Sequence, residues 1–180
     1  MKKIFPVFLI FAMVINFTSC KKGDNDPTLP FGTRDGLITN TWTLQSLTKT
    51  VTSVNALGST DTRTYIFDGS TMTEKHTNIW GAISEDSYAY SDSLVISKDN
   101  TYYRAIEEGD SKTETKAFWY WHNSNKNKIG ISFKNGTIYF INRLARKELV
   151  LEYSDYVVNT DGDGNVVTVT NNEMLTYSAE

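Results

Sequence analysis

The feature that most constrains the fold is a series of short alternating apolar and polar runs that extends from residue 41 to residue 180. These runs are rich in Thr, Val, Ile and aromatic residues, which is the composition of β-strands. Gly, Asn and Asp separate the runs, as they do in antiparallel sheets. No stretch keeps a helical spacing of apolar residues for three turns. We therefore predict an all-β, antiparallel fold.

The alternation also predicts which side chains face inward. The inward pairs include Trp42 with Leu44 in the first strand and Leu94 with Ile96 in a later one. Tight turns are expected at Asp68-Gly69, Asp99-Asn100 and Asn135-Gly136, and the last of these suits a type I′ hairpin. A long antiparallel sheet needs protected edges, and closure into a barrel removes them. A meander barrel is the predicted architecture, and a two-sheet β-sandwich is the alternative.

Length and charge exclude some functions. The chain has 180 residues, a formal net charge of −3 and one cysteine, so it cannot form an internal disulfide. A mildly acidic chain has no electrostatic footprint for nucleic acid, and we expect no nucleic-acid partner.

The N-terminus has the pattern of a secretory signal. Lys2 and Lys3 precede an apolar run over residues 4–17, and small residues follow. The segment Phe17-Thr18-Ser19-Cys20 resembles a bacterial lipobox, which implies cleavage after residue 19 and lipidation of Cys20. Bacterial lipoproteins carry two or more acyl chains, enough for stable anchoring. The alternative is that Cys20 belongs to a longer signal peptide and is lost with it.

This reading divides the chain into three parts. Residues 1–19 are the signal peptide, residues 20–37 are a lipidated tether, and residues 38–180 are the barrel domain. The tether contains several Gly and Pro residues, so we expect it to be flexible. The expected location is the bacterial cell envelope, as an outer-membrane lipoprotein that faces either the periplasm or the cell surface. Asp24 and Asp26 resemble a surface-export signal, with a solvated linker as the alternative.

Three segments resemble the lipocalin-like domains of bacterial lipoproteins. They are the opening strand Thr41-Trp42-Thr43-Leu44, the stretch 95–102, and the pair formed by 140–144 and 147–151. The resemblance covers roughly residues 38–156. It departs from true lipocalins at Asn40, where they have Gly. It implies a lipocalin-like barrel that holds a small apolar or amphipathic ligand.

The aromatic residues are the candidates for ligand binding. Tyr65, Tyr88, Trp119 and Trp121 are predicted to line an apolar cup, and the alternative is that they are ordinary core residues. Phe118 and Tyr120 face away from the two tryptophans, so that both faces of this strand are aromatic. The second hypothesis is therefore an envelope or surface interaction protein with a filled barrel and an unidentified protein partner.

The sequence shows no readable catalytic or metal-binding chemistry. His76 and His122 are the only histidines, and a zinc site needs more convergent ligands than that. The stretch 161–165 has oxygen ligands at alternate positions, as calcium loops do, but it lacks the rest of the motif, so we predict a plain turn. We expect a non-catalytic protein without metal or cofactor.

Overall fold

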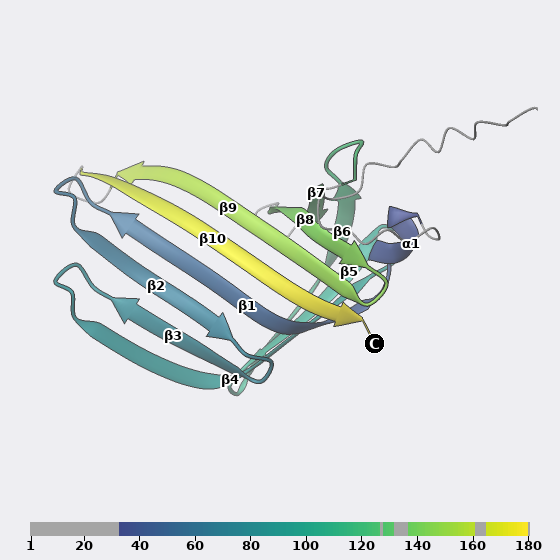
Figure 1. Cartoon of the computed structure of the whole chain (residues 1–180), viewed down its shortest axis with the longest axis horizontal. Coiled ribbons are helices and arrows are strands. Elements are labelled where there is room, and N and C mark those ends of the chain that lie inside the picture. The colour runs from purple at the N-terminus through teal and green to yellow at the C-terminus, as the bar shows by residue number, and fades with distance from the viewer. Residues whose placement is uncertain (1–32, 127, 132–136, 161–164, 180) are drawn as a thin grey trace, which may run out of the picture.

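The computed structural model describes residues 33–126, 128–131, 137–160 and 165–179. It is almost entirely antiparallel β-structure (Figure 1). The elements in chain order are α1 (Arg34–Ile38), β1 (Thr41–Val54), β2 (Thr60–Phe67), β3 (Thr71–Thr77), β4 (Ile83–Ile96), β5 (Thr101–Glu108), β6 (Ser111–Trp121), β7 (Lys128–Ile131), β8 (Ile138–Ala145), β9 (Glu148–Thr160) and β10 (Val166–Ala179).

The ten strands form a closed meander barrel in the order β1-β10-β9-β8-β7-β6-β5-β4-β3-β2, which confirms the predicted fold class. In addition, Thr41–Thr43 of β1 pairs directly with β4. This pairing bypasses β2 and β3, so the other eight strands close on themselves. We call them the closed ring. Beyond it the β2–β3 hairpin separates β1 from β4. We call the strands at that end, β9-β10-β1-β2-β3-β4, the open sheet.

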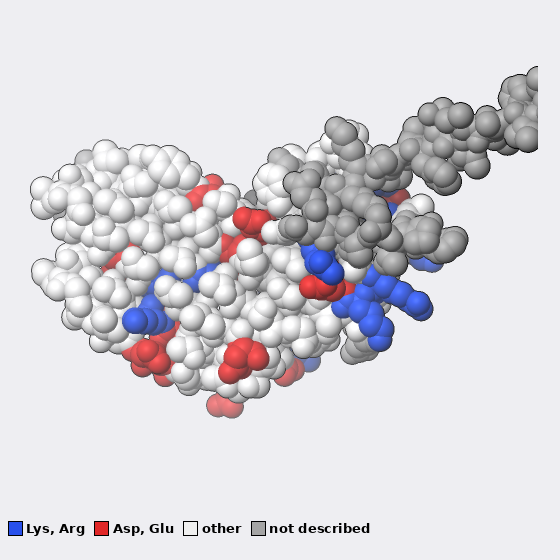
Figure 2. Space-filling view, in the orientation of Figure 1, with Lys and Arg blue, Asp and Glu red and all other residues white. Residues whose placement is uncertain are grey.

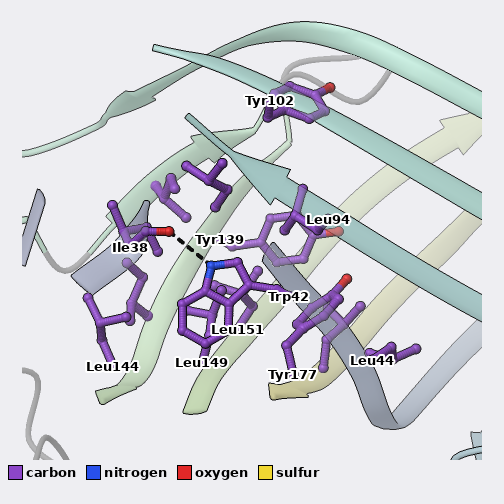
Figure 3. Packing of buried hydrophobic residues seen from close by; sticks show 14 of the residues in the cluster. Ile38, Trp42, Leu44, Leu94, Tyr102, Tyr139, Leu144, Leu149, Leu151 and Tyr177 are labelled. Carbon is purple, nitrogen blue, oxygen red and sulfur yellow. Dashed lines mark hydrogen bonds between the residues drawn. The ribbon is translucent and has the colours of Figure 1, made fainter. Parts of the chain in front are cut away.

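The closed ring contains most of the hydrophobic core, to which Phe67 of β2 and Met72 of β3 also belong. Trp42 is fully buried, and its Nε1 donates a hydrogen bond to the Ile38 carbonyl at 2.9 Å. Figure 3 shows apolar side chains from several strands around this indole, among them Leu94, Leu149 and Tyr177. The inward positions predicted for the first strand, Trp42 and Leu44, are confirmed as buried.

The helix α1 corrects the predicted end of the tether. Residues 34–37, expected to be flexible, form a helix whose first turn is capped by the Thr33 hydroxyl, which accepts from the Gly36 N–H. Ile38 is fully buried, so the helix covers one end of the ring. Five residues are too few to show a helical period, which is why the sequence did not reveal it. Among the described residues, no helix is long and apolar enough to cross a membrane.

Two of the predicted turns are confirmed. Gly69 has φ +105° and Asn100 has φ +65°, the left-handed conformations that tight turns require. Asp68 stabilises its turn by accepting hydrogen bonds from the Ser70 and Thr71 N–H groups. The predicted hairpin at Asn135-Gly136, the turn at 161–164, the signal peptide and Cys20 lie outside the described residues.

The open sheet has two edges, because β4 and β9 extend past their partners β5 and β8. On each edge an aspartate side chain accepts a hydrogen bond from a backbone N–H group. Asp86 Oδ1 accepts from the Ser87 N–H, and Asp155 Oδ1 accepts from the Tyr156 N–H, both at 2.8 Å. A charged side chain on an edge discourages pairing with another strand. The edges left by incomplete closure are thus protected locally.

Candidate functional site on the inner face of the open sheet

The inner face of the open sheet continues the core-facing side of the barrel. Its first row across the strands is apolar and consists of Leu151, Leu175, Leu47, Phe67 and Met72, followed by Tyr88. Two residues further along each strand, the row becomes polar and reads Tyr153, Glu173, Lys49, Tyr65, Glu74 and Asp86. An apolar floor therefore adjoins a row of tyrosines and charged groups.

Four half-buried tyrosines border this floor: Tyr65, Tyr88, Tyr90 and Tyr153. The Tyr90 ring packs edge-on against Phe67, with 5.3 Å between the ring centroids. The ring of Tyr153 packs against that of Tyr139, with 5.7 Å between the ring centroids. Contacts of this kind hold aromatic rings in fixed positions. The floor is therefore surrounded by rings with one face packed and part of their surface accessible.

Burial and neighbouring carboxylates raise the pKa of two of these tyrosine hydroxyls further above neutral pH. Burial, with a smaller contribution from the hydrogen bond to Glu108, raises the pKa of Tyr88 to about 12. Burial also raises the pKa of Tyr90, and the charge of Asp92 adds to the effect. At neutral pH these hydroxyls are therefore hydrogen-bond donors beside acidic acceptors, an arrangement that suits the polar part of an amphipathic molecule.

A buried ion pair fills the barrel between the core and this face. Asp92 is 1% exposed and receives hydrogen bonds from Arg104 Nε at 2.8 Å and from the Tyr177 hydroxyl at 2.9 Å. Arg104 Nη2 bonds the second carboxylate oxygen, which makes the pair bidentate. Nearby, the Tyr139 hydroxyl donates to Glu173 Oε2 at 3.2 Å. On β4, Asp92 thus stands between Tyr90 of the open sheet and Leu94 of the core.

Farther along the inner face lies a polar hollow of about 240 Å³, lined by Arg63, Glu74, His76, Ser84, Glu85 and Asp86. Two ion pairs lie beside it or across it: Arg63 with Glu74 at 3.8 Å, and His76 Nε2 with Asp61 Oδ2 at 2.8 Å. Among the described residues, no three His, Cys, Asp or Glu side chains are grouped closely enough to hold a metal ion.

The four residues predicted to line one cup form two separate pairs. Trp119 and Trp121 pack edge-to-face at 5.6 Å. Trp119 Nε1 donates to the Ser97 carbonyl at 2.9 Å, and Trp121 Nε1 donates to Asp35 at 2.6 Å. Trp119 is 4% exposed, so it belongs to the core.

The tyrosine pair lies elsewhere. Tyr65 is close enough to Tyr88 to influence its pKa. Tyr88 precedes Ser97, the partner of Trp119, by nine residues along the chain, about 30 Å of extended strand. Tyr65 and Tyr88 therefore belong to the inner face of the open sheet, and the tryptophans belong to the closed ring.

The second aromatic face of β6 has a partly structural explanation. Phe118 and Tyr120 point outward and are 70% and 46% exposed. The Tyr120 ring covers Gly130, its partner on β7, so closely that a Cβ on Gly130 would lie 2.2 Å from the Tyr120 ring. An aromatic ring over a strand glycine replaces the missing side chain. This packing accounts for Tyr120 but does not account for the exposed ring of Phe118.

Sequence reasoning missed the buried ion pair, although the signal was present. Leu94 and Ile96 were predicted to face inward, and two residues earlier on the same face stands Asp92. The alternation that buries Tyr102 likewise buries Arg104. An aspartate and an arginine at inward positions of neighbouring strands predict a pair, because an isolated buried charge is costly.

Comparison of the chain with protein-family models, curated proteins and solved structures finds no match. The likeness to lipocalin-like domains therefore stays a prediction made from the sequence.

Proposed function

We propose that this protein is a non-catalytic, lipid-anchored binding module that holds a small amphipathic molecule on the inner face of the open sheet. The observation that carries the proposal is the arrangement of four half-buried tyrosines around the apolar floor. An apolar surface with a few fixed polar groups is the usual composition of a small-molecule site. The apolar part of the ligand would lie against the accessible faces of the tyrosine rings, beneath which Phe67 and Met72 are buried, and its polar part would meet the tyrosine hydroxyls.

We place the ligand on the open sheet and not inside the closed ring. The ring interior is occupied by the core around Trp42 and by the Asp92–Arg104 pair. A ligand there would have to displace a bidentate buried ion pair, and breaking such a pair costs about 3–5 kcal/mol. The tyrosines of the inner face are already partly accessible, so a ligand can reach them without that cost.

The ligand proposal is tested by native mass spectrometry of the full chain, purified gently from its own membranes. We expect a co-purifying molecule, and we expect the Tyr65→Ala/Tyr88→Ala variant to lose it. The matched control is Phe118→Ala/Tyr156→Ala, which removes two exposed outward rings and should retain the molecule. A bare protein mass for the unaltered chain, or equal retention in both double variants, would refute this site.

The anchor is tested separately through Cys20. The Cys20→Ala variant should remain an unprocessed precursor and should not incorporate labelled fatty acid. The unaltered chain is the positive control. Fatty-acid label on the variant would show that the lipid is attached elsewhere and would remove the anchor from the proposal while leaving the ligand site intact.

A further inference from the structure

Two turns at the far end of the open sheet have the same construction. In the β1–β2 turn, the Asn55 side chain accepts hydrogen bonds from the Leu57 and Ser59 N–H groups. In the β3–β4 turn, the Asn78 side chain accepts from the Trp80 and Ala82 N–H groups in the same way. A glycine at positive φ follows each apolar residue, with φ +79° at Gly58 and φ +78° at Gly81.

This construction fixes one large apolar side chain at each tip. Leu57 is 90% exposed and Trp80 is 84% exposed. Ile79 and Ile83 flank Trp80 and are also exposed. Because the turn backbone is held by side-chain and backbone hydrogen bonds, binding through the tips would cost little backbone ordering entropy.

The two tips are neighbours, and they lie far from the start of the fold. Residue Thr62 of β2 pairs with Thr77 of β3, so the two hairpins lie side by side, about 10 Å apart at two strand spacings. Figure 1 shows both tips at the end of the molecule opposite α1. No charged residue occurs in residues 55–60 or 78–83, and Figure 2 shows the described surface at the left end, where the two tips lie, as white.

We infer that these two tips dock onto a lipid bilayer that faces the membrane holding the N-terminus. The inference rests on the anchor in the proposed function, because the anchor precedes α1 and the two tips lie at the end of the barrel opposite α1. A protein interface surrounds its apolar centre with polar and charged contacts, and neither tip offers a charge. A bilayer surface requires no matched pocket, and Trp prefers the interface between headgroups and acyl chains.

The test uses the full lipidated chain reconstituted into phosphatidylcholine vesicles, to which vesicles of brominated phosphatidylcholine are added. Bromine quenches tryptophan on contact. Trp42 and Trp119 are buried, and Trp121 is partly buried beside α1, at the end opposite the tips, so the quenching expected from the added vesicles comes mainly from Trp80. The Trp80→Phe variant should lose most of the quenching. Leu57→Ser should weaken vesicle association roughly tenfold, the effect of removing one buried leucine side chain.

Phe118→Ser is the matched control, because Phe118 is a large exposed apolar residue away from the tips, and it should leave the quenching unchanged. Flotation of the first vesicles shows separately whether the chain is anchored. If the chain floats with its vesicles and the added brominated lipid does not quench it, the inference is overturned, and the tips then serve a protein partner or the chain's own bilayer.

Discussion

The closed ring and the open sheet share four long strands, yet they differ in what those strands carry inward. On β1 the inward residues of the ring are Trp42 and Leu44, both buried, whereas in the open sheet they are Lys49 and Val51, both partly exposed. On β10 the inward residue of the ring is the buried Tyr177, whereas in the open sheet it is the partly exposed Glu173. The same strand geometry thus supports a packed core at one end and an accessible polar surface at the other.

The difference shows that strand length and burial are specified separately. All four strands remain paired across both regions, so backbone hydrogen bonds alone do not close the barrel. Closure occurs where large apolar side chains can meet across the interior. Where charged side chains replace them, the β2–β3 hairpin is inserted and the sheet stays open, because isolated charges cannot be buried cheaply.

The largest expected contrast comes from truncating one inward residue in each region of β1. Trp42→Ala should lower the free energy of unfolding by about 3–5 kcal/mol, because it leaves a large cavity and removes the hydrogen bond to Ile38. Val51→Ala, on the same strand in the open sheet, should cost at most about 1 kcal/mol. Urea unfolding measures both, and equal losses would contradict the division into two regions.

The next contrast compares two aspartates. Asp92→Ala should cost about 3–5 kcal/mol, because it leaves Arg104 buried without its carboxylate partner. Asp61→Ala removes the partner of the partly exposed His76 and should cost less than about 1 kcal/mol. The same urea experiment applies. A small effect at Asp92 would mean that the ion pair does not stabilise the closed ring.

A third contrast concerns the edges, which the open sheet has and the closed ring lacks. Asp86→Ala and Asp155→Ala should change stability by less than about 1 kcal/mol but increase self-association, since each uncovers an edge N–H group. Light scattering at increasing protein concentration measures the change. Asp110→Ala, in the exposed turn between β5 and β6, is the control and should scatter like the unaltered chain.

The smallest effect expected is a dependence on alkaline pH. The pKa of Tyr88 rises from about 10 to about 12 on folding, so between these values the folded chain holds a proton that the unfolded chain releases. Stability should therefore fall as the pH rises through this window. Tyr88→Phe should make that fall shallower, as measured by urea unfolding at a series of pH values. An unchanged slope would place Tyr88 in an environment like water.

The sequence predicted the strands and the barrel well, because both depend on local alternation. Trp42 with Leu44 identified the core side of β1, and Gly69 and Asn100 were correctly placed in turns. The division into a ring and an open sheet was not predicted. It depends on which strands pair with β1, and the contact of Thr41–Thr43 with β4 joins residues 50 to 54 positions apart.

The candidate site was predicted only in part. Tyr65, Tyr88, Trp119 and Trp121 were grouped in one cup because their side-chain chemistry is similar, whereas the two tyrosines lie on the open sheet and the two tryptophans in the closed ring. Alternation assigns a residue to the inner or outer face and does not give its height along the barrel. That height follows from strand register, and registers that differ by two residues have the same alternation of faces.

Native-state hydrogen exchange is the most direct test of the claim that the closed ring holds the fold together while the open sheet is an accessible binding surface. We predict that inward-facing segments of the ring, such as Leu149–Leu151, exchange only through global unfolding. The backbone of β9 after Asp155, and the segment of β10 that pairs with it, should exchange at least about a hundredfold faster through local opening. Equal protection along the whole of β9 and β10 would contradict the account.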